Sequence, residues 1–251
     1  MQAQAANPLF TIITVCYNSG ETIERAIKSV LEQAYTDYEY IIIDGMSTDN
    51  TLEIVRSYPT KFQGKMKYIS EADNGIYDAI NKGIALAKGS LIGILNSDDW
   101  YESNTLDVIA AHHQPGRDVI YYGLLRYLRE GKEYMVLSYN HEFLNEKMIN
   151  HPTCFVTKGI YNEVGKYDLK YKLAADYDFM LNCKEKGYNF RHLPFILSNM
   201  SMEGSSKDYH LRSRVETYNI MYKHKCLSNA NRMLRIIDLY LKYYFKKIFG
   251  L

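Results

Sequence analysis

The chain has 251 residues, of which 47% are hydrophobic and 24% charged, so it is long enough for one large α/β domain or two small ones. This composition excludes a disordered, collagen-like or disulfide-stapled protein, and the formal net charge is only +1. The basic residues are not interleaved with aromatic side chains outside the C-terminal segment, which argues against nucleic-acid binding.

The first hundred residues alternate between apolar runs and amphipathic segments. The apolar runs predict strands at residues 10–17, 38–44, 66–70 and 91–95. Segments with helical spacing predict helices between them, from residue 23, at 50–57 and at 76–87. Strands that alternate with helices in this way predict a parallel, right-handed, doubly wound sheet.

The pattern becomes mixed beyond residue 118. Residues 119–128 and 134–139 resemble a hairpin, residues 177–186 a helix and residues 190–197 a strand. We therefore expect a single domain over residues 1–228, with a nucleotide-binding half at 1–117 and an acceptor-facing half at 118–228. A separate basic, amphipathic helix is expected at residues 229–251.

Two adjacent carboxylates, Asp98 and Asp99, follow directly on an apolar strand. Burying them costs free energy unless a cation or hydrogen-bond donors compensate the charge. Mg²⁺ or Mn²⁺ commonly takes one or two carboxylates and completes its shell with water and substrate phosphates, so the pair points to a ligand that carries a diphosphate. The alternative is that Asp98 caps a helix and Asp99 is solvated.

Three segments carry a resemblance to a known family: TIITVCYNSGETIERAIKSVLEQAY, YEYIIIDGMSTDNT and DNGIYDAINKGIALAKGSLIGILNSDDW. In this order and spacing they resemble the family 2 glycosyltransferases with the GT-A fold, of the bacterial cell-surface polysaccharide type. A later segment, HPTCFVTKGIYNEVGKYDLKYKLAADYDFML, is similar to the acceptor and catalytic-base region of that family. The resemblance covers roughly residues 10–200 and implies transfer of a sugar from a nucleotide-sugar donor.

The resemblance implies a set of donor-binding residues: Tyr17 and Asn18 against the nucleotide, Asp44 as acceptor for the base, Asp73, Asn74 and Gly75 bordering the pocket, and Asp98 near the ribose or a metal-bound water. Asp99 is the implied ligand of Mn²⁺ or Mg²⁺. The purely structural alternatives are a tight turn at Tyr17–Asn18 and a helix cap at Asp44. Many family members have an Arg where this chain has Ile80, so the diphosphate would need another cation, such as Lys82, Lys207 or Arg212.

Sugar transfer to a hydroxyl needs a base for the acceptor proton, and Asp176 is the candidate. The family usually shows Glu-Asp here, whereas this chain has Ala175 before the Asp. Asp178 is the rival, and Asp176 could instead only cap the helix that follows. A single displacement assisted by one carboxylate inverts the anomeric centre.

Five further residues are candidates for the acceptor side or a lid. His151 could contact either substrate, although a lone His is more often structural. Trp100 could stack on a sugar or pack in the core. The cations Lys207, His210 and Arg212 follow a small-residue segment that suits a lid over a diphosphate, with a solvated loop as the alternative.

The last 20 residues carry five basic side chains and one acidic beside a broad apolar face. This favours a helix on an anionic membrane leaflet, which would suit an acceptor carried on a polyprenyl lipid, against packing on protein as the alternative. No signal peptide or membrane-spanning run is evident, and four cysteines without a CxxC pair fit a cytoplasmic protein, peripheral at most on the inner face of the plasma membrane.

We therefore expect an inverting, metal-dependent glycosyltransferase that moves a sugar from a nucleoside diphosphate, UDP in the first instance, to a glycan or lipid-linked glycan. The rivals are a non-catalytic nucleotide-sugar or glycan-binding module and a sugar nucleotidyltransferase. The latter would need a Gly-rich, Arg-containing loop after the first strand, which residues 16–21 do not supply.

Overall fold

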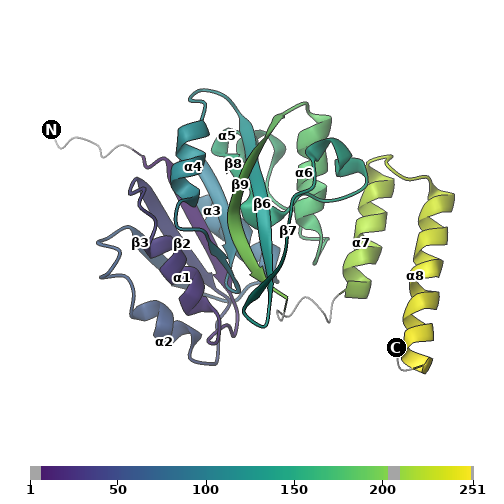
Figure 1. Ribbon diagram of the computed structural model, residues 1–251, viewed down its shortest axis with the longest axis horizontal. Helices are drawn as coiled ribbons and strands as arrows, with labels where there is room; N and C mark the ends of the chain where they lie inside the picture. Colours follow the sequence, from purple (N-terminus) through teal and green to yellow (C-terminus); the bar gives the residue numbers. More distant parts are fainter. Residues whose placement is uncertain (1–6, 203–209, 250–251) are drawn as a thin grey trace.

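The computed structural model describes residues 7–202 and 210–249, with the side chains of residue 210 and of residues 246–249 left aside. One mixed sheet runs through the molecule, and in the described part of the chain it contains nine strands. Its strand order is β3-β2-β1-β4-β8-β6-β9-β5, and β7 pairs with β6 at the side (Figure 1).

The first four strands form a parallel half-sheet. They are β1 (Phe10–Cys16), β2 (Tyr38–Asp44), β3 (Met66–Ser70) and β4 (Leu91–Asn96), with β1 between β2 and β4. Every residue of β1 is buried, as expected for a strand of a sheet covered on both faces. The predicted doubly wound parallel arrangement is therefore confirmed for this half.

The second half of the sheet is mixed. Its strands are β5 (Asp99–Tyr101), β6 (Val119–Arg129), β7 (Lys132–Leu137), β8 (Phe155–Thr157) and β9 (Asn189–Ser201). β8 joins the two halves because it pairs antiparallel with both β4 and β6. The predicted hairpin is present as β6 and β7, although β7 begins and ends two residues earlier than expected.

Helices cover both faces of this sheet (Figure 1). α1 (Ile23–Leu31), α2 (Thr51–Arg56) and α4 (Thr105–His112) pack into one apolar cluster. On the opposite face α3 (Ile76–Leu86), α5 (Lys158–Val164) and α6 (Ala175–Glu185) form the other, together with part of α7 (His210–Lys223). Two 3-10 helices, η1 (His141–Asn145) and η2 (His151–Thr153), lie between β7 and β8 in the chain.

The last helix, α8 (Asn229–Phe249), packs against α7 at the side of the molecule (Figure 1). Within the described residues, no helix is both long enough and apolar enough to cross a membrane.

Candidate functional site

The loops after β1, β2 and β4 are joined to one another at the edge of the sheet. The Asn18 side-chain oxygen accepts a hydrogen bond from the backbone N–H of Thr48 at 2.8 Å. The backbone N–H of Asn18 donates to Ser47 Oγ, also at 2.8 Å, and Ser97 Oγ donates to Ser19 Oγ at 2.9 Å. Asn18 has a φ of +49°, a left-handed conformation that Asn tolerates well. The predicted convergence of these loops is confirmed: Asn18 joins the loop after β1 to the loop after β2, and Ser19 joins it to the loop after β4.

Asp44 is fully buried at the end of β2. One oxygen accepts from Ser47 Oγ at 2.5 Å and the other from Ser70 Oγ at 2.6 Å, while the backbone N–H of Ser47 approaches both. These donors compensate the carboxylate and fix the loop after β2. Both Asp44 oxygens are thus bonded within the chain, and the role of Asp44 as acceptor for a nucleotide base stays a prediction from the family resemblance.

Asp73 lies directly beside this loop. A Cβ atom added at Gly45 would sit 2.5 Å from Asp73 Oδ2 and 3.5 Å from a ring carbon of Tyr17. The Tyr17 side chain is 63% exposed, and Asp73 Oδ1 accepts a hydrogen bond from the backbone N–H of Gly75 at 2.8 Å. Gly45 therefore provides the space in which an exposed ring and a carboxylate lie together.

Asn74 and Gly75 shape the next turn. The backbone N–H of Asn74 donates to Asp78 Oδ2 at 2.9 Å, and its carbonyl accepts from Lys172 Nζ at 3.2 Å. Gly75 is the N-cap of α3 with a φ of +112°, a conformation that favours glycine. Lys82, which sequence analysis considered as a diphosphate cation, forms an ion pair with Glu71 at 2.9 Å.

Asp99 begins β5 and is completely buried. Its Oδ2 accepts from Asn96 Nδ2 at 3.1 Å, whereas Oδ1 has no hydrogen-bond partner among the described residues. Burial and the neighbouring Asp98 charge raise the pKa of Asp99 well above its usual range. A half-satisfied buried carboxylate beside a second carboxylate fits a hard divalent cation, although the described residues hold no cluster of three or more ligating side chains.

One face of α1 holds the acidic turn in place. Arg25 donates from Nη2 to the Asp98 carbonyl at 3.0 Å, and Ser29 Oγ accepts from the backbone N–H of Tyr101 at 3.1 Å. Gln33 Nε2 donates to the Glu102 carbonyl at 2.7 Å. Arg25 and Ser29 lie one turn apart on α1, and Gln33 follows two residues after its end. The i, i+4 and i+8 spacing of these polar side chains was the signal that sequence analysis missed.

Trp100 points to a different part of the molecule from the predicted base. The Arg25 guanidinium lies 3.7 Å from the centre of its indole ring, a cation–π contact. Trp100 lines a cavity of about 470 Å³ against α1, together with Glu21, Lys28 and Ser103. It does not line the cavity that contains Asp176, and its role as a sugar-stacking platform stays a prediction.

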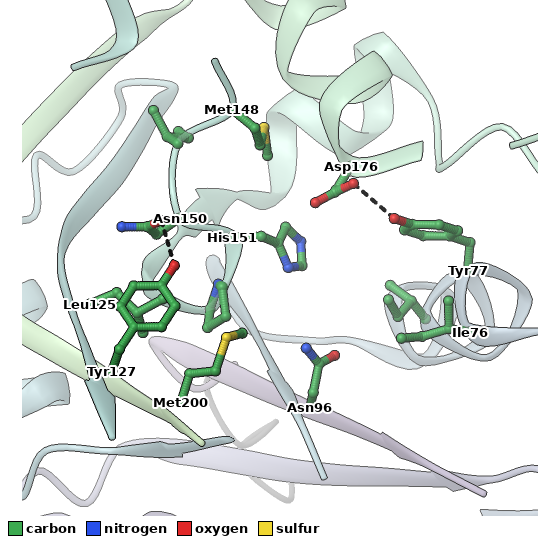
Figure 2. Close-up of a pocket in the computed structure, with 13 residues that line it drawn as sticks. Ile76, Tyr77, Asn96, Leu125, Tyr127, Met148, Asn150, His151, Asp176 and Met200 are labelled. Atoms are coloured by element: carbon green, nitrogen blue, oxygen red, sulfur yellow. Dashed lines mark hydrogen bonds between the residues drawn. The ribbon is translucent and has the colours of Figure 1, made fainter. Parts of the chain in front are cut away.

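A cavity of about 270 Å³ contains the predicted base. Figure 2 shows Asp176 and His151 pointing into it, with Asn96 on the opposite side and Tyr127 and Met200 closing it. Asn96, which lines this cavity, is also the donor to Asp99, so it connects the cavity wall to the acidic turn. The remaining walls are mostly apolar.

Tyr77 on α3 orients the Asp176 carboxylate. Its hydroxyl donates to Asp176 Oδ1 at 2.8 Å, and the second oxygen is directed into the cavity (Figure 2). Burial and the Asp176 charge raise the pKa of Tyr77 well above its usual range, so Tyr77 stays a hydrogen-bond donor at neutral pH. Burial lowers the pKa of His151, which lies 3.0 Å from the Tyr167 hydroxyl through Nε2. His151 therefore lines the cavity as an uncharged imidazole at neutral pH.

Asp178, the rival base, is 3% exposed and faces away from this cavity. Its oxygens accept from Lys223 Nζ at 2.7 and 2.9 Å, and His224 Nε2 lies 3.0 Å from Oδ1. His224 Nδ1 in turn lies 2.8 Å from Glu185. Asp178 thus joins α6 to the C-terminal end of α7, whereas Asp176 lines the cavity.

The structure describes only part of the segment that was predicted to form a lid. Lys207 falls outside the described residues, and so does the side chain of His210, whose backbone begins α7. Arg212 is exposed on the first turn of α7.

Glu216 of α7 caps the segment that leads into α6. Its Oε1 accepts from the backbone N–H of Lys172 at 3.0 Å, and Oε2 accepts from those of Leu173 and Ala174 at 2.8 and 3.1 Å. No local sequence signal connects Glu216 with residues 43 positions away. The contact holds the start of the helix whose first turn carries Asp176.

Glu216→Gln is expected to loosen this segment locally, because an amide has one acceptor oxygen where the carboxylate has two. Amide hydrogen exchange at residues 172–174 should rise by about tenfold, which corresponds to about 1.4 kcal/mol. Thr217→Val, which removes a hydrogen bond within α7 itself, is the matched control. Unchanged exchange at residues 172–174 in Glu216→Gln would show that the carboxylate does not hold them.

Comparison with known proteins supports one family. The family model described as "Glycosyl transferase family 2" matches residues 11–163. The PGL/p-HBAD biosynthesis glycosyltransferase of Mycobacterium tuberculosis is 31% identical over 185 residues, which cover 71% of this chain and 70% of that protein.

Two solved structures show the same fold at low sequence identity. TarS of S. aureus in complex with UDP-GlcNAc has a TM-score of 0.69 and 17% identity, covering 92% of this chain and 71% of that one. The mannosyltransferase PcManGT of Pyrobaculum calidifontis, in complex with GDP-Man and Mn²⁺, has a TM-score of 0.63 and 17% identity, covering 88% and 64%. The chain therefore belongs to glycosyl transferase family 2 and has the fold of the GT-A glycosyltransferases.

Proposed function

We propose that this glycosyltransferase moves a sugar from a nucleoside diphosphate, UDP in the first instance, to a hydroxyl of a glycan or lipid-linked glycan, with inversion of the anomeric centre. The observation that supports this most is the cavity that Asp176 and Asn96 share, because Asn96 is bonded to Asp99. A base and an acidic turn then face one reacting centre from two sides.

Asp176 is the proposed general base. Its free oxygen accepts the proton of the acceptor hydroxyl while that oxygen forms a bond to the anomeric carbon. The bond between the anomeric carbon and the diphosphate oxygen breaks, and the diphosphate leaves with the electron pair. Tyr77 holds the other Asp176 oxygen at 2.8 Å, so the carboxylate is oriented before the substrate arrives.

Asp99, with Asp98 beside it, is the proposed holder of Mn²⁺ or Mg²⁺. The buried Oδ1 of Asp99 without a hydrogen-bond partner in the described part of the chain is the observation that fits a cation there. When bound, such a cation stabilises negative charge on the leaving diphosphate. Arg25, Ser29 and Gln33 keep this turn against α1.

Asp73, rather than Asp44, is the proposed acceptor for the base of the nucleotide. Uracil has a donor at N3, and Asp73 Oδ2 lies beside the exposed Tyr17 ring in the space left by Gly45. A base stacked on Tyr17 could present this edge to the carboxylate. Asn18, in the loop that carries Tyr17, is still proposed to lie against the nucleotide, and Asn74 and Gly75 to border the nucleotide pocket.

The two rival functions have less support. The segment after β1 does not supply the Gly-rich, Arg-containing loop that a sugar nucleotidyltransferase would need. Its backbone N–H groups at residues 18–20 already donate to side chains that follow β2. A non-catalytic binding module would not need a carboxylate oriented by a buried tyrosine at the cavity wall.

Asp176→Asn is expected to abolish turnover and leave donor binding within about twofold, because the neutral amide cannot accept the acceptor proton. Asp99→Asn is expected to remove the Mn²⁺-dependent part of the thermal stabilisation by UDP-sugars, since ligand binding raises stability by up to about 2.7 kcal/mol at a hundredfold excess over Kd. Release of UDP and thermal unfolding across a panel of nucleotide sugars, with and without Mn²⁺, measure both effects.

Asp168→Asn, which alters an acidic loop residue outside the Asp176 cavity, is the matched control and should change neither quantity. Equal loss of donor binding in Asp176→Asn and Asp99→Asn would contradict the assigned roles.

Asp73→Asn is expected to weaken UDP binding by about 10- to 100-fold, in line with about 1.5–3 kcal/mol for a hydrogen bond to a charged group. Because an amide can pair with both the donor and the acceptor edge of cytosine, the ratio of CDP to UDP affinity should rise. Asp44→Asn should instead lower the free energy of unfolding and leave that ratio unchanged, since its oxygens serve Ser47 and Ser70. Calorimetric titration decides between them, and a changed ratio in Asp44→Asn alone would overturn the assignment.

A further inference from the structure

The outward side of α8 is a continuous apolar face. Its members recur at helical spacing along the helix, and each is between 41% and 66% exposed: Met233, Leu234, Ile237, Tyr240, Leu241 and Tyr244. A contiguous exposed apolar surface of this kind marks a site of contact with a partner or a membrane. Leu234 and Leu241, at 63% and 66%, are its most exposed aliphatic side chains.

The other side of α8 is held against α7, which fixes the direction of the apolar face. Arg232 donates to Asn219 Oδ1 at 2.8 Å and lies over the Tyr222 ring at 4.8 Å. The Arg235 guanidinium lies 5.8 Å from the centre of the Tyr218 ring. Figure 1 shows α8 as the outermost helix on this side of the molecule, beyond α7.

The charge of α8 is strongly one-sided. The sequence of the helix contains five basic residues, Arg232, Arg235, Lys242, Lys246 and Lys247, against the single acidic Asp238. Asp238 forms an exposed ion pair with Lys242 at 2.7 Å, so its charge is locally compensated. The helix therefore combines an exposed apolar face with a net positive charge.

We infer that α8 binds the surface of an anionic lipid bilayer, with its apolar face among the acyl chains and headgroups and its net positive charge attracted to the lipid phosphates. A second copy of the chain would bring together two α8 helices with the same net positive charge, whereas anionic headgroups complement that charge. Within the described residues no helix is apolar enough to cross the bilayer, so α8 would lie along it.

The consequence for the enzyme rests on the proposed function. Glu216, in the middle of α7, binds the backbone just before α6. Lys223 and His224, at the C-terminal end of α7, contact Asp178 of α6. Because the first turn of α6 carries Asp176, a membrane-bound α8 would hold the proposed base at a set position relative to the bilayer. An acceptor hydroxyl carried on a lipid would then meet the site without leaving the membrane.

Binding of the full chain to vesicles tests this inference without donor, acceptor or turnover. The probes are vesicles of phosphatidylcholine alone and of equal parts phosphatidylcholine and phosphatidylglycerol, separated by sedimentation. The wild type should bind the anionic vesicles more tightly by at least about tenfold, and added salt should weaken that binding.

The double variant Leu234→Gln/Leu241→Gln should lose at least about tenfold in binding to anionic vesicles, because two leucines no longer enter the apolar region. Leu86→Gln/Leu169→Gln is the matched control, since both leucines are exposed elsewhere on the surface, and it should bind as the wild type does. Arg235→Gln/Lys242→Gln should reduce the difference between the two kinds of vesicle. Circular dichroism checks that each variant is folded.

The inference fails if the wild type does not bind anionic vesicles, or if the Leu234→Gln/Leu241→Gln variant binds as well as the control. It also fails if light scattering finds a dimer that this variant dissociates while vesicles bind neither form. Since no step of the assay needs catalysis, a chain that binds vesicles but transfers no sugar would contradict the proposed function and leave this inference intact.

Discussion

The candidate site depends on how buried carboxylates are compensated at one edge of the sheet. Asp44 at the end of β2 and Asp99 at the start of β5 are both fully buried, yet only Asp44 has both oxygens bonded to donors. Asp99 has one oxygen bonded to Asn96 and one without a hydrogen-bond partner in the described part of the chain. Because a buried charge needs compensation, this difference separates a structural aspartate from one suited to a cation.

The surrounding helices position this edge rather than contribute chemistry themselves. The polar row on α1 fixes the acidic turn, the N-terminal part of α3 supplies Tyr77, and Glu216 of α7 fixes the start of α6. Three helices from different parts of the chain thus hold the acidic turn and the Asp176 carboxylate, and Asn96 connects the acidic turn to the cavity wall. The same α7 connects that cavity to α8, so that the cavity and the exposed C-terminal face belong to one connected set of contacts.

The sequence predicted the first half of the fold closely, because continuous apolar runs between turn residues leave few alternatives for β1, β2, β3 and β4. It missed β5 and β8, which at three residues each are too short to show a period. The sequence left Asp176 and Asp178 as alternatives for the base, and the proposal of Asp176 rests on contacts of Lys223 and His224 with Asp178 that no local pattern shows. The hydrogen bond from Ser70 to Asp44 could not be predicted, because Ser70 lies 26 residues away and carries no motif.

The most direct test of this account is the position of a bound cation. In a crystal of the protein soaked with UDP and Mn²⁺, the account predicts an anomalous peak within about 2.5 Å of Asp99 Oδ1, between the diphosphate and the acidic turn. A peak elsewhere, or a hydrogen-bonded water at Asp99 Oδ1 with UDP bound away from it, would contradict the central claim.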